Sequence, residues 1–293
     1  MITSTRNPRI VRIRKLAQRK HRQRQNCFLV EGLQLLSMAV EAISTPSTPC
    51  ARVRPGEVYY SEPLFTGETA PRLLTDLTGA GAEPIPVDAN VLNTLSERDR
   101  SQGLAVTFGV SDLECTLEQL VLTISPISGR QITAAGARSP KLVLILDRLQ
   151  DPGNMGTIFR TADAVGVPGL FLLEPCVDPF DPKTVRSTMG SIFSVPFART
   201  SRIDELFQHL ARLGYSLVGA DTTRGSNAWQ SDALRGPVAL ILGNEAQGLS
   251  PDLQRTITSY VSVPQHGRAE SLNVAVAGAV LMYEWLRVNN ENI

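Results

Sequence analysis

The second half of the chain is constrained most by an unbroken apolar run from Leu142 to Leu146. A run of strand length without a polar residue is typical of a parallel strand that is buried on both faces. Short apolar runs then alternate with helical spacing towards the C-terminus. Strands are expected at residues 169–173, 192–196, 215–220, 237–242 and 260–263, and helices at 184–189, 203–213 and from 273 onward. This alternation predicts an α/β domain with a mostly parallel sheet.

The length of 293 residues exceeds that of a usual single domain, so two domains are expected. Short strands are predicted at 27–32, 57–60, 83–87 and 103–110, with a helix at 33–42. A stretch rich in small residues follows at 124–139. These features predict a small α/β domain at residues 1–112, a linker at 113–139 and the larger α/β domain at 140–293.

Composition narrows the class of protein. The sequence is 42% hydrophobic and 19% charged, as expected for a globular protein with a sizeable core. No apolar run approaches the ~20 residues of a membrane span, and the first residues lack the apolar segment of a signal peptide, so a cytoplasmic protein without membrane contact is expected. The four cysteines and three histidines are scattered, which predicts reduced thiols and no metal site.

The net charge of +1 hides a basic N-terminal arm. Residues 1–24 hold nine of the 29 basic residues and no acid, which leaves 20 basic against 28 acidic residues in the rest of the chain. The spacing predicts one helix with an apolar stripe of Ile10, Ile13, Leu16 and Ala17, and with Arg12, Lys15, Arg19 and Arg22 on the other face. A solvated surface helix would explain the pattern too, but the missing acids favour RNA or DNA binding by those four cations.

Three polar, glycine-rich loops follow predicted strands, at residues 151–156, 243–249 and 265–273. Ligands of parallel sheets bind beyond the carboxyl ends of the strands. The second loop fails the dinucleotide pattern G-x-G-x-x-G because Glu245 stands at its second glycine, so a Rossmann site is disfavoured. Ser271 is the expected N-cap of the last helix. The polar residues of the loops are either capping residues or parts of one site, and their occurrence in three loops favours the site.

The loops resemble the three ordered motifs of the SpoU (TrmH) family of RNA ribose 2′-O-methyltransferases. The first loop matches N-P-G-N-x-G-x-x-x-R up to Arg160, with Asp151 in place of the first Asn. The second is Leu242-Gly-Asn-Glu245, and the third ends in Ser271-Leu-Asn273. The resemblance implies a trefoil-knotted α/β domain of the SPOUT type that binds S-adenosylmethionine and dimerises. More weakly, the basic arm with residues 28–32 resembles the RNA-binding N-terminal domain of the family.

The resemblance also implies roles for single residues. Arg160 matches the catalytic arginine of the family; a guanidinium with a pKa above ~12 is a poor base, which favours electrostatic action, while base action stays open. Asn154, Glu245 and Asn273 would complete the catalytic group. The residues implied to contact the cofactor are Leu242, Gly243, Val263, Ser271 and Leu272.

The expected function is therefore methyl transfer from S-adenosylmethionine to an RNA ribose 2′-hydroxyl. The separate N-terminal domain with its basic arm resembles that of the ribosomal members of the family, which implies ribosomal RNA as the substrate, and transfer RNA stays open. A different class is a non-catalytic RNA-binding protein that keeps the fold. Loss of the arginine or of the Glu and Asn residues would favour that class, and all of them are present in the sequence.

Overall fold

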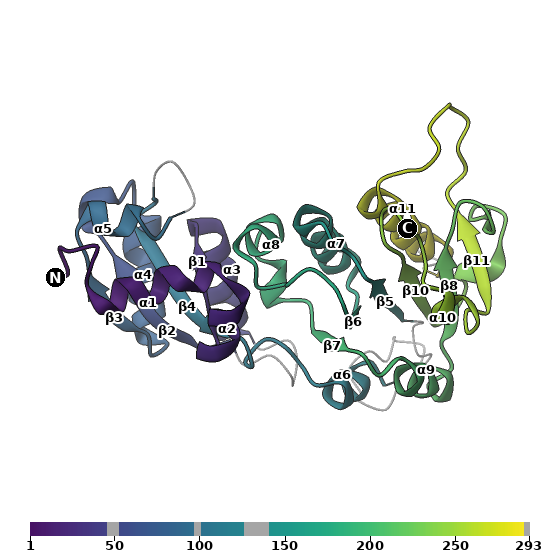
Figure 1. Ribbon diagram of the computed structural model, residues 1–293, viewed down its shortest axis with the longest axis horizontal. Coiled ribbons are helices and arrows are strands. Elements are labelled where there is room, and N and C mark those ends of the chain that lie inside the picture. Colours follow the sequence, from purple (N-terminus) through teal and green to yellow (C-terminus); the bar gives the residue numbers. More distant parts are fainter. Residues whose placement is uncertain (46–52, 97–100, 126–140, 290–293) are drawn as a thin grey trace. The chain divides into compact units, whose positions relative to one another are not determined.

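The computed structural model describes residues 1–45, 53–96, 101–125 and 141–289 (Figure 1). Its contacts divide the chain into two compact units. The first unit comprises Met1–Glu114 and Asp178–Ser194, and the second comprises Cys115–Val177 and Val195–Ile293. The segment Asp178–Ser194, from the middle of the sequence, thus belongs to the N-terminal unit. The predicted domain boundaries at 112 and 140 assign this segment to the C-terminal domain instead.

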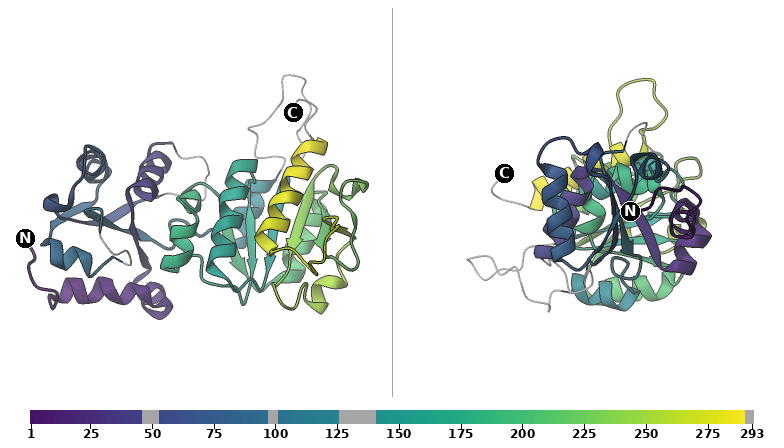
Figure 2. Two further views of the ribbon diagram at one scale, coloured as in Figure 1. Left: turned by 90° about the horizontal axis from the view of Figure 1, so that it is seen from above. Right: turned by 90° about the vertical axis from the view of Figure 1, so that its left-hand side faces the viewer.

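The N-terminal unit is built on a mixed sheet in the order β1-β4-β2-β3. The strands are β1 (Cys27–Glu31), β2 (Pro55–Tyr60), β3 (Glu83–Pro86) and β4 (Leu104–Gly109). β4 pairs antiparallel with both β1 and β2, while β3 runs parallel to β2. Helices α3 (Leu33–Ser44) and α4 (Thr69–Gly79) lie on one side of this sheet, and the N-terminal arm and α5 (Ala89–Asn93) lie on the other (Figure 2).

The basic arm forms two short helices instead of the single helix that its spacing predicts. α1 (Pro8–Arg14) is capped by Asn7, and α2 (Arg19–Gln25) begins after Gln18, whose extended backbone interrupts the helix. The apolar stripe is nevertheless largely correct. Ile10, Ile13 and Leu16 are at most 1% exposed and pack with Tyr59, Val91 and neighbouring side chains, whereas Ala17 is exposed. The arm is therefore part of the core of this unit.

Segment 178–194 is joined to the N-terminal unit by ionic and aromatic contacts. It contains α8 (Pro182–Ser187). Arg22 donates to Oδ2 of Asp178 from Nε at 3.1 Å and from Nη2 at 2.7 Å, and both side chains are buried. The ring of Phe180 lies 4.8 Å from that of Phe28. Arg22 and Asp178 are 156 positions apart in the sequence. The segment therefore belongs to this unit because of tertiary packing and not because of its place in the sequence.

The second unit contains a seven-stranded sheet, in the order β7-β6-β5-β10-β8-β11-β9 within the described residues. Its strands are β5 (Leu142–Asp147), β6 (Leu170–Leu173), β7 (Phe197–Thr200), β8 (Ser216–Ala220), β9 (Ser226–Asn227), β10 (Val238–Leu242) and β11 (Ser259–Ser262). All neighbouring pairs described are parallel. Every residue of β5 and β10 is buried, and for β5 this confirms the prediction of a strand covered on both faces.

Helices cover both faces of this sheet (Figure 1). α7 (Pro152–Val165) and α11 (Val274–Asn289) lie side by side on one face (Figure 2), and α6 (Leu117–Ile124) and α9 (Ile203–Arg212) lie on the other. A further short helix, α10 (Pro251–Gln254), follows β10. α6 occupies part of the predicted linker, and the rest of that linker from residue 126 lies outside the described residues.

One strand is misplaced in the prediction from sequence. The apolar residues 192–196 were expected to form a strand, but Ser191–Phe193 form a turn of 3₁₀ helix and the strand β7 begins at Phe197. Phe193 instead packs on Phe108 of the N-terminal unit, with ring centroids 5.1 Å apart. Apolar character alone does not separate a strand from a buried turn.

Two expectations from composition can be compared with the structure. Cys27, Cys115 and Cys176 form no disulfide bond among the described residues, and Cys50 lies outside those residues. None of the helices in the described residues has the length and apolar character needed to cross a membrane.

Candidate active site

Three loops leave the carboxyl ends of parallel strands in the second unit. The first follows β5 at Asp147, the second follows β10 at Leu242 and the third follows β11 at Ser262. Because neighbouring parallel strands end at the same edge of a sheet, the loops can meet there. They contain the three glycine-rich stretches predicted from the sequence to form one site, at residues 151–156, 243–249 and 265–273.

A chain of side-chain hydrogen bonds joins the three loops. Nδ2 of Asn154, at the start of α7, donates to Oε1 of Glu245 at 3.0 Å. Nδ2 of Asn273 donates to Oδ1 of Asn154 at 2.9 Å. The carboxylate of Glu245 also accepts the backbone N–H groups of Gln150 and Asp151 at 3.4 and 3.3 Å. The structure therefore brings together three of the four predicted catalytic residues.

The first loop carries Asp151 where the motif has Asn, and its role is clear from the geometry. Oδ1 of Asp151 accepts the backbone N–H of Asn154 at 2.7 Å, which makes Asp151 the N-cap of α7. Asp and Asn offer the same acceptor at an N-cap, and a carboxylate adds a favourable charge at the positive end of the helix. The departure from the motif thus preserves the loop.

Arg148, which was not among the residues predicted from the sequence, forms a second link between the first two loops. Arg148 adopts the left-handed conformation with φ 55°. Its guanidinium binds the carboxylate of Asp147 at 3.1 Å, Oε1 of Gln247 at 3.0 Å and the carbonyl of Gly248 at 3.3 Å. The other carboxylate oxygen of Asp147 accepts the N–H of Ser250 at 2.7 Å. The sequence feature that indicates this link is the charged pair Asp147-Arg148, directly after the apolar run 142–146.

Comparison with known proteins identifies the group to which this arrangement belongs. Residues 141–283 match the SpoU rRNA Methylase family, and residues 7–106 match the MRM3-like substrate binding domain. An uncharacterised tRNA/rRNA methyltransferase of Synechocystis is 32% identical over 97% of this chain and 92% of its own length. The Bacillus subtilis 23S rRNA (guanosine(2553)-2′-O)-methyltransferase RlmP is 32% identical over 96% of this chain and 97% of its own. The chain belongs to the SpoU rRNA methylase family.

Solved structures of SpoU proteins have the same fold over nearly the whole chain. The AdoMet-bound rRNA methyltransferase from Sinorhizobium meliloti superposes with a TM-score of 0.81 at 30% identity, and the match covers 99% of this chain and 98% of that one. The SpoU methyltransferase AviRb from Streptomyces viridochromogenes, in complex with AdoMet, gives 0.76 at 28% identity over 97% and 98% of the two chains. The predicted family and fold class are confirmed, and S-adenosylmethionine is the cofactor of this family.

Arg160, the predicted catalytic arginine of this SpoU protein, lies on α7 and is exposed. It has no hydrogen-bond or ion-pair partner among the described residues, whereas Arg148, in the loop before α7, binds Gln247. Asn154 and Arg160 share the rigid helix α7, so the loop network fixes the helix from which the guanidinium projects. The geometry leaves this guanidinium available to an anion.

The third loop offers the features that a small polar ligand needs. Among the described residues, no hydrogen bond joins the backbone groups of 263–272 to any other part of the chain. Oε1 of Gln265 is buried and lacks a partner in the described residues. A buried polar atom without a partner is costly, so a ligand that satisfies it is favoured. Of the residues predicted to contact the cofactor, Val263, Ser271 and Leu272 lie on this loop.

The other two predicted cofactor residues lie where β10 ends. Leu242 is fully buried in β10, so its side chain belongs to the core. Gly243 is packed so closely that an added Cβ would lie 2.5 Å from the backbone carbon of Gly248 and 2.7 Å from the nitrogen of Leu249. The second loop therefore folds back on itself at a glycine. The buried oxygen of Gln265 and the unpaired backbone groups of the third loop are the features that fit S-adenosylmethionine.

Ser271 is not the N-cap of α11, which corrects the expectation from sequence. Oδ1 of Asn273 accepts the N–H groups of Ala275 and Val276 at 2.9 and 3.3 Å. Asn273 stands directly before the first helical residue, whereas Ser271 lies two positions too early and is exposed. Asn is as good a cap as Ser, so residue type alone could not separate the two.

One of the four predicted RNA-binding residues is also corrected. Arg22 is 2% exposed, binds Asp178 and donates to the carbonyls of Leu16 and Ala17 at 2.7 and 2.9 Å, so it cannot reach a phosphate. Arg12 is exposed but is held by Glu57 at 2.6 Å. Lys15 and Arg19 are exposed. The arm presents fewer cations than its sequence predicts, because part of its charge is used inside the protein.

Proposed function

We propose that this chain transfers a methyl group from S-adenosylmethionine to a ribose 2′-hydroxyl of ribosomal RNA. The observation that carries the proposal is the hydrogen-bonded connection of Glu245, Asn154 and Asn273 across the three motif loops. The relatives support the substrate class, because RlmP of Bacillus subtilis and RlmB of Ralstonia are named as 23S rRNA guanosine 2′-O-methyltransferases.

The reaction sets two demands on the protein. S-adenosylmethionine, when bound, would supply a methyl group on a sulfonium: a C–O bond would form as the C–S bond breaks, the sulfur would leave as a neutral thioether, and the hydroxyl proton would pass to solvent water. A ribose hydroxyl is a weak nucleophile. The protein must therefore hold it in line and stabilise the negative charge that develops on its oxygen.

Arg160 is the residue proposed for charge stabilisation. Its guanidinium is exposed and lacks a protein partner in the described part of the chain, so it can contact the ribose oxygen or a neighbouring phosphate. A guanidinium stays protonated at neutral pH, which suits electrostatic stabilisation better than removal of a proton. Planar, two-point binding of a phosphate would in addition fix the position of the nucleotide.

Asn154, Glu245 and Asn273 are proposed to fix the geometry of the reaction. Glu245 collects two backbone N–H groups of the first loop and the amide of Asn154, so the first and second loops move as one. Asn273 ties the third loop to them. We assign the cofactor to Leu242 and Gly243 at the end of β10 and to Val263, Ser271 and Leu272 of the third loop, where backbone groups without a partner among the described residues would bind it. The trefoil knot of these loops is part of the same proposal.

The N-terminal unit is proposed to bind the RNA. Its match to a substrate binding domain covers residues 7–106, and its arm exposes Lys15 and Arg19. We retain the division into an RNA-binding domain at 1–112, a linker at 113–139 and a methyltransferase domain at 140–293 as a proposal for the linear sequence. Ribosomal RNA is preferred to transfer RNA, and the cytosol is the proposed place of action.

The proposed active form is a homodimer. α11 exposes two large apolar side chains, Val276 at 49% and Tyr283 at 53%. They are seven residues apart and therefore lie on one face of the helix. Association of two copies through this face would remove both side chains from water. Sedimentation velocity of the wild type and of Tyr283→Glu tests the proposal, with a monomeric variant as the expected result.

The function is tested with purified protein and labelled S-adenosylmethionine. Deproteinised ribosomal RNA and transfer RNA from cells that lack the protein serve as parallel substrates. We expect one 2′-O-methylated nucleotide in ribosomal RNA, located by mapping of 2′-O-methyl positions. Methylation of transfer RNA alone would reverse the substrate assignment. RNA binding without methyl transfer to either RNA would favour a non-catalytic binding protein.

A further inference from the structure

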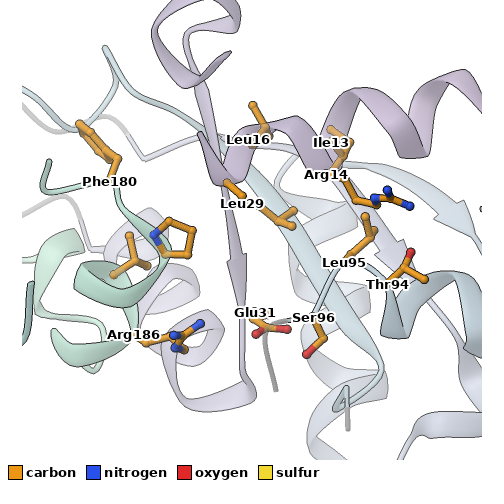
Figure 3. Close-up of a pocket in the computed structure, with 13 residues that line it drawn as sticks. Ile13, Arg14, Leu16, Leu29, Glu31, Thr94, Leu95, Ser96, Phe180 and Arg186 are labelled. Carbon is orange, nitrogen blue, oxygen red and sulfur yellow. The ribbon is translucent and has the colours of Figure 1, made fainter. Parts of the chain in front are cut away.

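The N-terminal unit contains a pocket that none of the residues of the motif loops lines (Figure 3). Its volume is about 120 Å³, and it opens between the α1 segment, strand β1, the turn after α5 and the start of α8. All lining residues belong to the unit formed by Met1–Glu114 and Asp178–Ser194. The catalytic proposal uses none of these residues.

The walls of the pocket are apolar and its rim is charged. Leu29 and Leu95 lie at its centre in Figure 3, and Pro182 and Val185 of the 178–194 segment complete the apolar wall. Arg14 lies at one end of the pocket, and Glu31 and Arg186 lie along another side (Figure 3). The rim therefore holds two cations and one anion, with an excess of positive charge.

Two buried contacts keep the 178–194 wall of the pocket in place. Arg22 binds Asp178 at 2.7 Å. Phe180, which also lines the pocket, packs on Phe28 of β1 with ring centroids 4.8 Å apart. Both aromatic rings are at most 2% exposed. The pocket is therefore preformed by the core and does not depend on surface side chains alone.

Arg14 is the cation of this pocket that is available to a ligand. On the same helix, Arg9 binds Glu83 at 3.0 Å and Arg12 binds Glu57. Arg14 is exposed and has no hydrogen-bond or ion-pair partner in the described ranges. A free guanidinium at the mouth of an apolar pocket suits a ligand with a flat apolar face and an attached anion.

We propose that this pocket receives one unpaired base of the RNA substrate, with a flanking phosphate on Arg14. The volume of about 120 Å³ is of the same order as the ~150 Å³ cavity that holds benzene, so the pocket has room for no more than one ring and excludes a base pair. Proteins that read RNA insert unstacked bases in this way and hold the backbone with cations. The carboxylate of Glu31 has several acceptor positions for the base edge, so an existing partner does not exhaust them. This proposal rests on the proposed function for its RNA.

Two variants of the full-length protein test the pocket separately from its charge. Ala17→Phe adds a ring at an exposed lining position, and Arg14→Gln removes the cation. The matched controls are Ala80→Phe and Arg72→Gln, which change exposed residues of α4 and its C-cap outside the pocket. The probe is deproteinised 23S ribosomal RNA from cells that lack the protein, and the readouts are its Kd across a salt series and KM and kcat for methyl transfer.

We expect Ala17→Phe to weaken RNA binding about tenfold and to raise KM with kcat unchanged, since one stacked base is lost. Arg14→Gln should lower the slope of log K against log salt by about 0.7, as for one phosphate contact. The controls should stay within about twofold of the wild type. S-adenosylmethionine affinity and the thermal midpoint, measured in parallel, should not move.

The outcomes separate this pocket from the proposed function. If the wild type methylates RNA and both pocket variants bind it with unchanged affinity and slope, the pocket assignment is wrong. If the wild type methylates no RNA while Ala17→Phe still weakens RNA binding, the catalytic proposal fails and the pocket stands. If Arg14→Gln weakens binding but Ala17→Phe does not, the site binds phosphate without a base, which overturns the proposal.

Discussion

The side-chain amide of Asn273 donates a hydrogen bond of 2.9 Å to Oδ1 of Asn154, across 119 residues of sequence. The other end of the same amide caps α11 through the N–H groups of Ala275 and Val276. One side chain thus anchors a helix and joins two loops. The two roles use different atoms, so they can be separated by substitution.

Asn273→Asp should keep the cap and lose the link. A carboxylate accepts the helix N–H groups as well as Asn does, but it cannot donate to Asn154. We expect a free energy of unfolding within about 0.5 kcal/mol of the wild type, with a reduced rate of methyl transfer. Asn273→Ala removes both roles and should lose about 1 kcal/mol as well. Urea unfolding and single-turnover assays give the two quantities, and equal activity of Asn273→Asp and the wild type would show that the link is dispensable.

Arg160→Ala should abolish methyl transfer without loss of stability. Its exposed guanidinium has no protein partner in the described residues, so its removal leaves no buried group unsatisfied. Loss of a transition-state contact costs about 3 to 4 kcal/mol, or two to three orders of magnitude in rate. Arg160→Lys should recover little of that rate if planar binding matters. Single-turnover kinetics measure the rate, and calorimetry with S-adenosylmethionine is the control; weakened cofactor binding would assign Arg160 a structural role.

Gly243→Ala should disturb the second loop. A Cβ at this position would lie 2.5 to 2.7 Å from backbone atoms of Gly248 and Leu249, which cannot rotate away. We expect S-adenosylmethionine affinity to fall at least tenfold. Gly79→Ala is the matched control, because Gly79 lies in α4 with no atom within 4 Å of an added Cβ. That control should be stabilising by about 0.5 to 1 kcal/mol. Calorimetry and thermal unfolding measure both; unchanged affinity in Gly243→Ala would remove this turn from the cofactor site.

Arg22→Met should strongly destabilise the N-terminal unit. It leaves the carboxylate of Asp178, which is 8% exposed, without its cation, and breaking a buried pair costs about 3 to 5 kcal/mol. The double variant Arg22→Met with Asp178→Leu should recover part of this loss, because no charge then stays buried. Arg24→Met, an exposed arginine of the same helix, should be nearly neutral. The denaturant midpoints of the wild type and of the three variants measure these changes in stability. Equal midpoints for Arg22→Met and Arg24→Met would contradict a buried pair.

Alkaline pH should reduce stability in part through Cys176. Burial raises the pKa of its thiol to about 12. The folded state therefore keeps its proton above pH 9, where the thiol of the unfolded chain ionises. The stabilisation is complete below pH 9 and is lost above it, by up to about 1.4 kcal/mol per pH unit for one proton. Burial also raises the pKa of Tyr215, which acts in the same direction. Melting temperatures from pH 7.5 to 10.5 should fall less steeply for Cys176→Ala, and parallel slopes would contradict this origin.

The sequence predicts the elements of the sheet well where one physical signal dominates. The apolar run at 142–146 has the length and composition of a buried parallel strand, and the order and spacing of the three motif loops indicate their family. Local signals failed where tertiary contacts decide. Arg22 looks like any other cation of the arm, and only the distant Asp178 makes it a buried residue. Ser271 and Asn273 are equally good capping residues, and it is the backbone conformation that places Asn273 at the N-cap of α11.

Two further features have too weak a local signal to be predicted from the sequence. α4 and α5 were not predicted, since Thr, Pro and Gly residues weaken the helical pattern of 69–79 and five residues are too few to show one at 89–93. The position of Arg148 depends on a left-handed backbone that residue type does not reveal.

Removal of residues 1–24, a natural test of a basic arm, would also strip Ile10, Ile13 and Leu16 from the core. Point substitutions are therefore the sounder test of RNA binding.

The inclusion of Asp178–Ser194 in the N-terminal unit has a consequence for how such chains can be recombined. The polypeptide passes from one unit to the other three times, after Glu114, after Val177 and after Ser194. A chimera made at a single junction near residue 114 would pair the aromatic core of one parent, at Phe28 and Phe108, with Phe180 and Phe193 of the other. Exchange of RNA specificity between relatives thus requires that both segments of the N-terminal unit, Met1–Glu114 and Asp178–Ser194, come from the same parent.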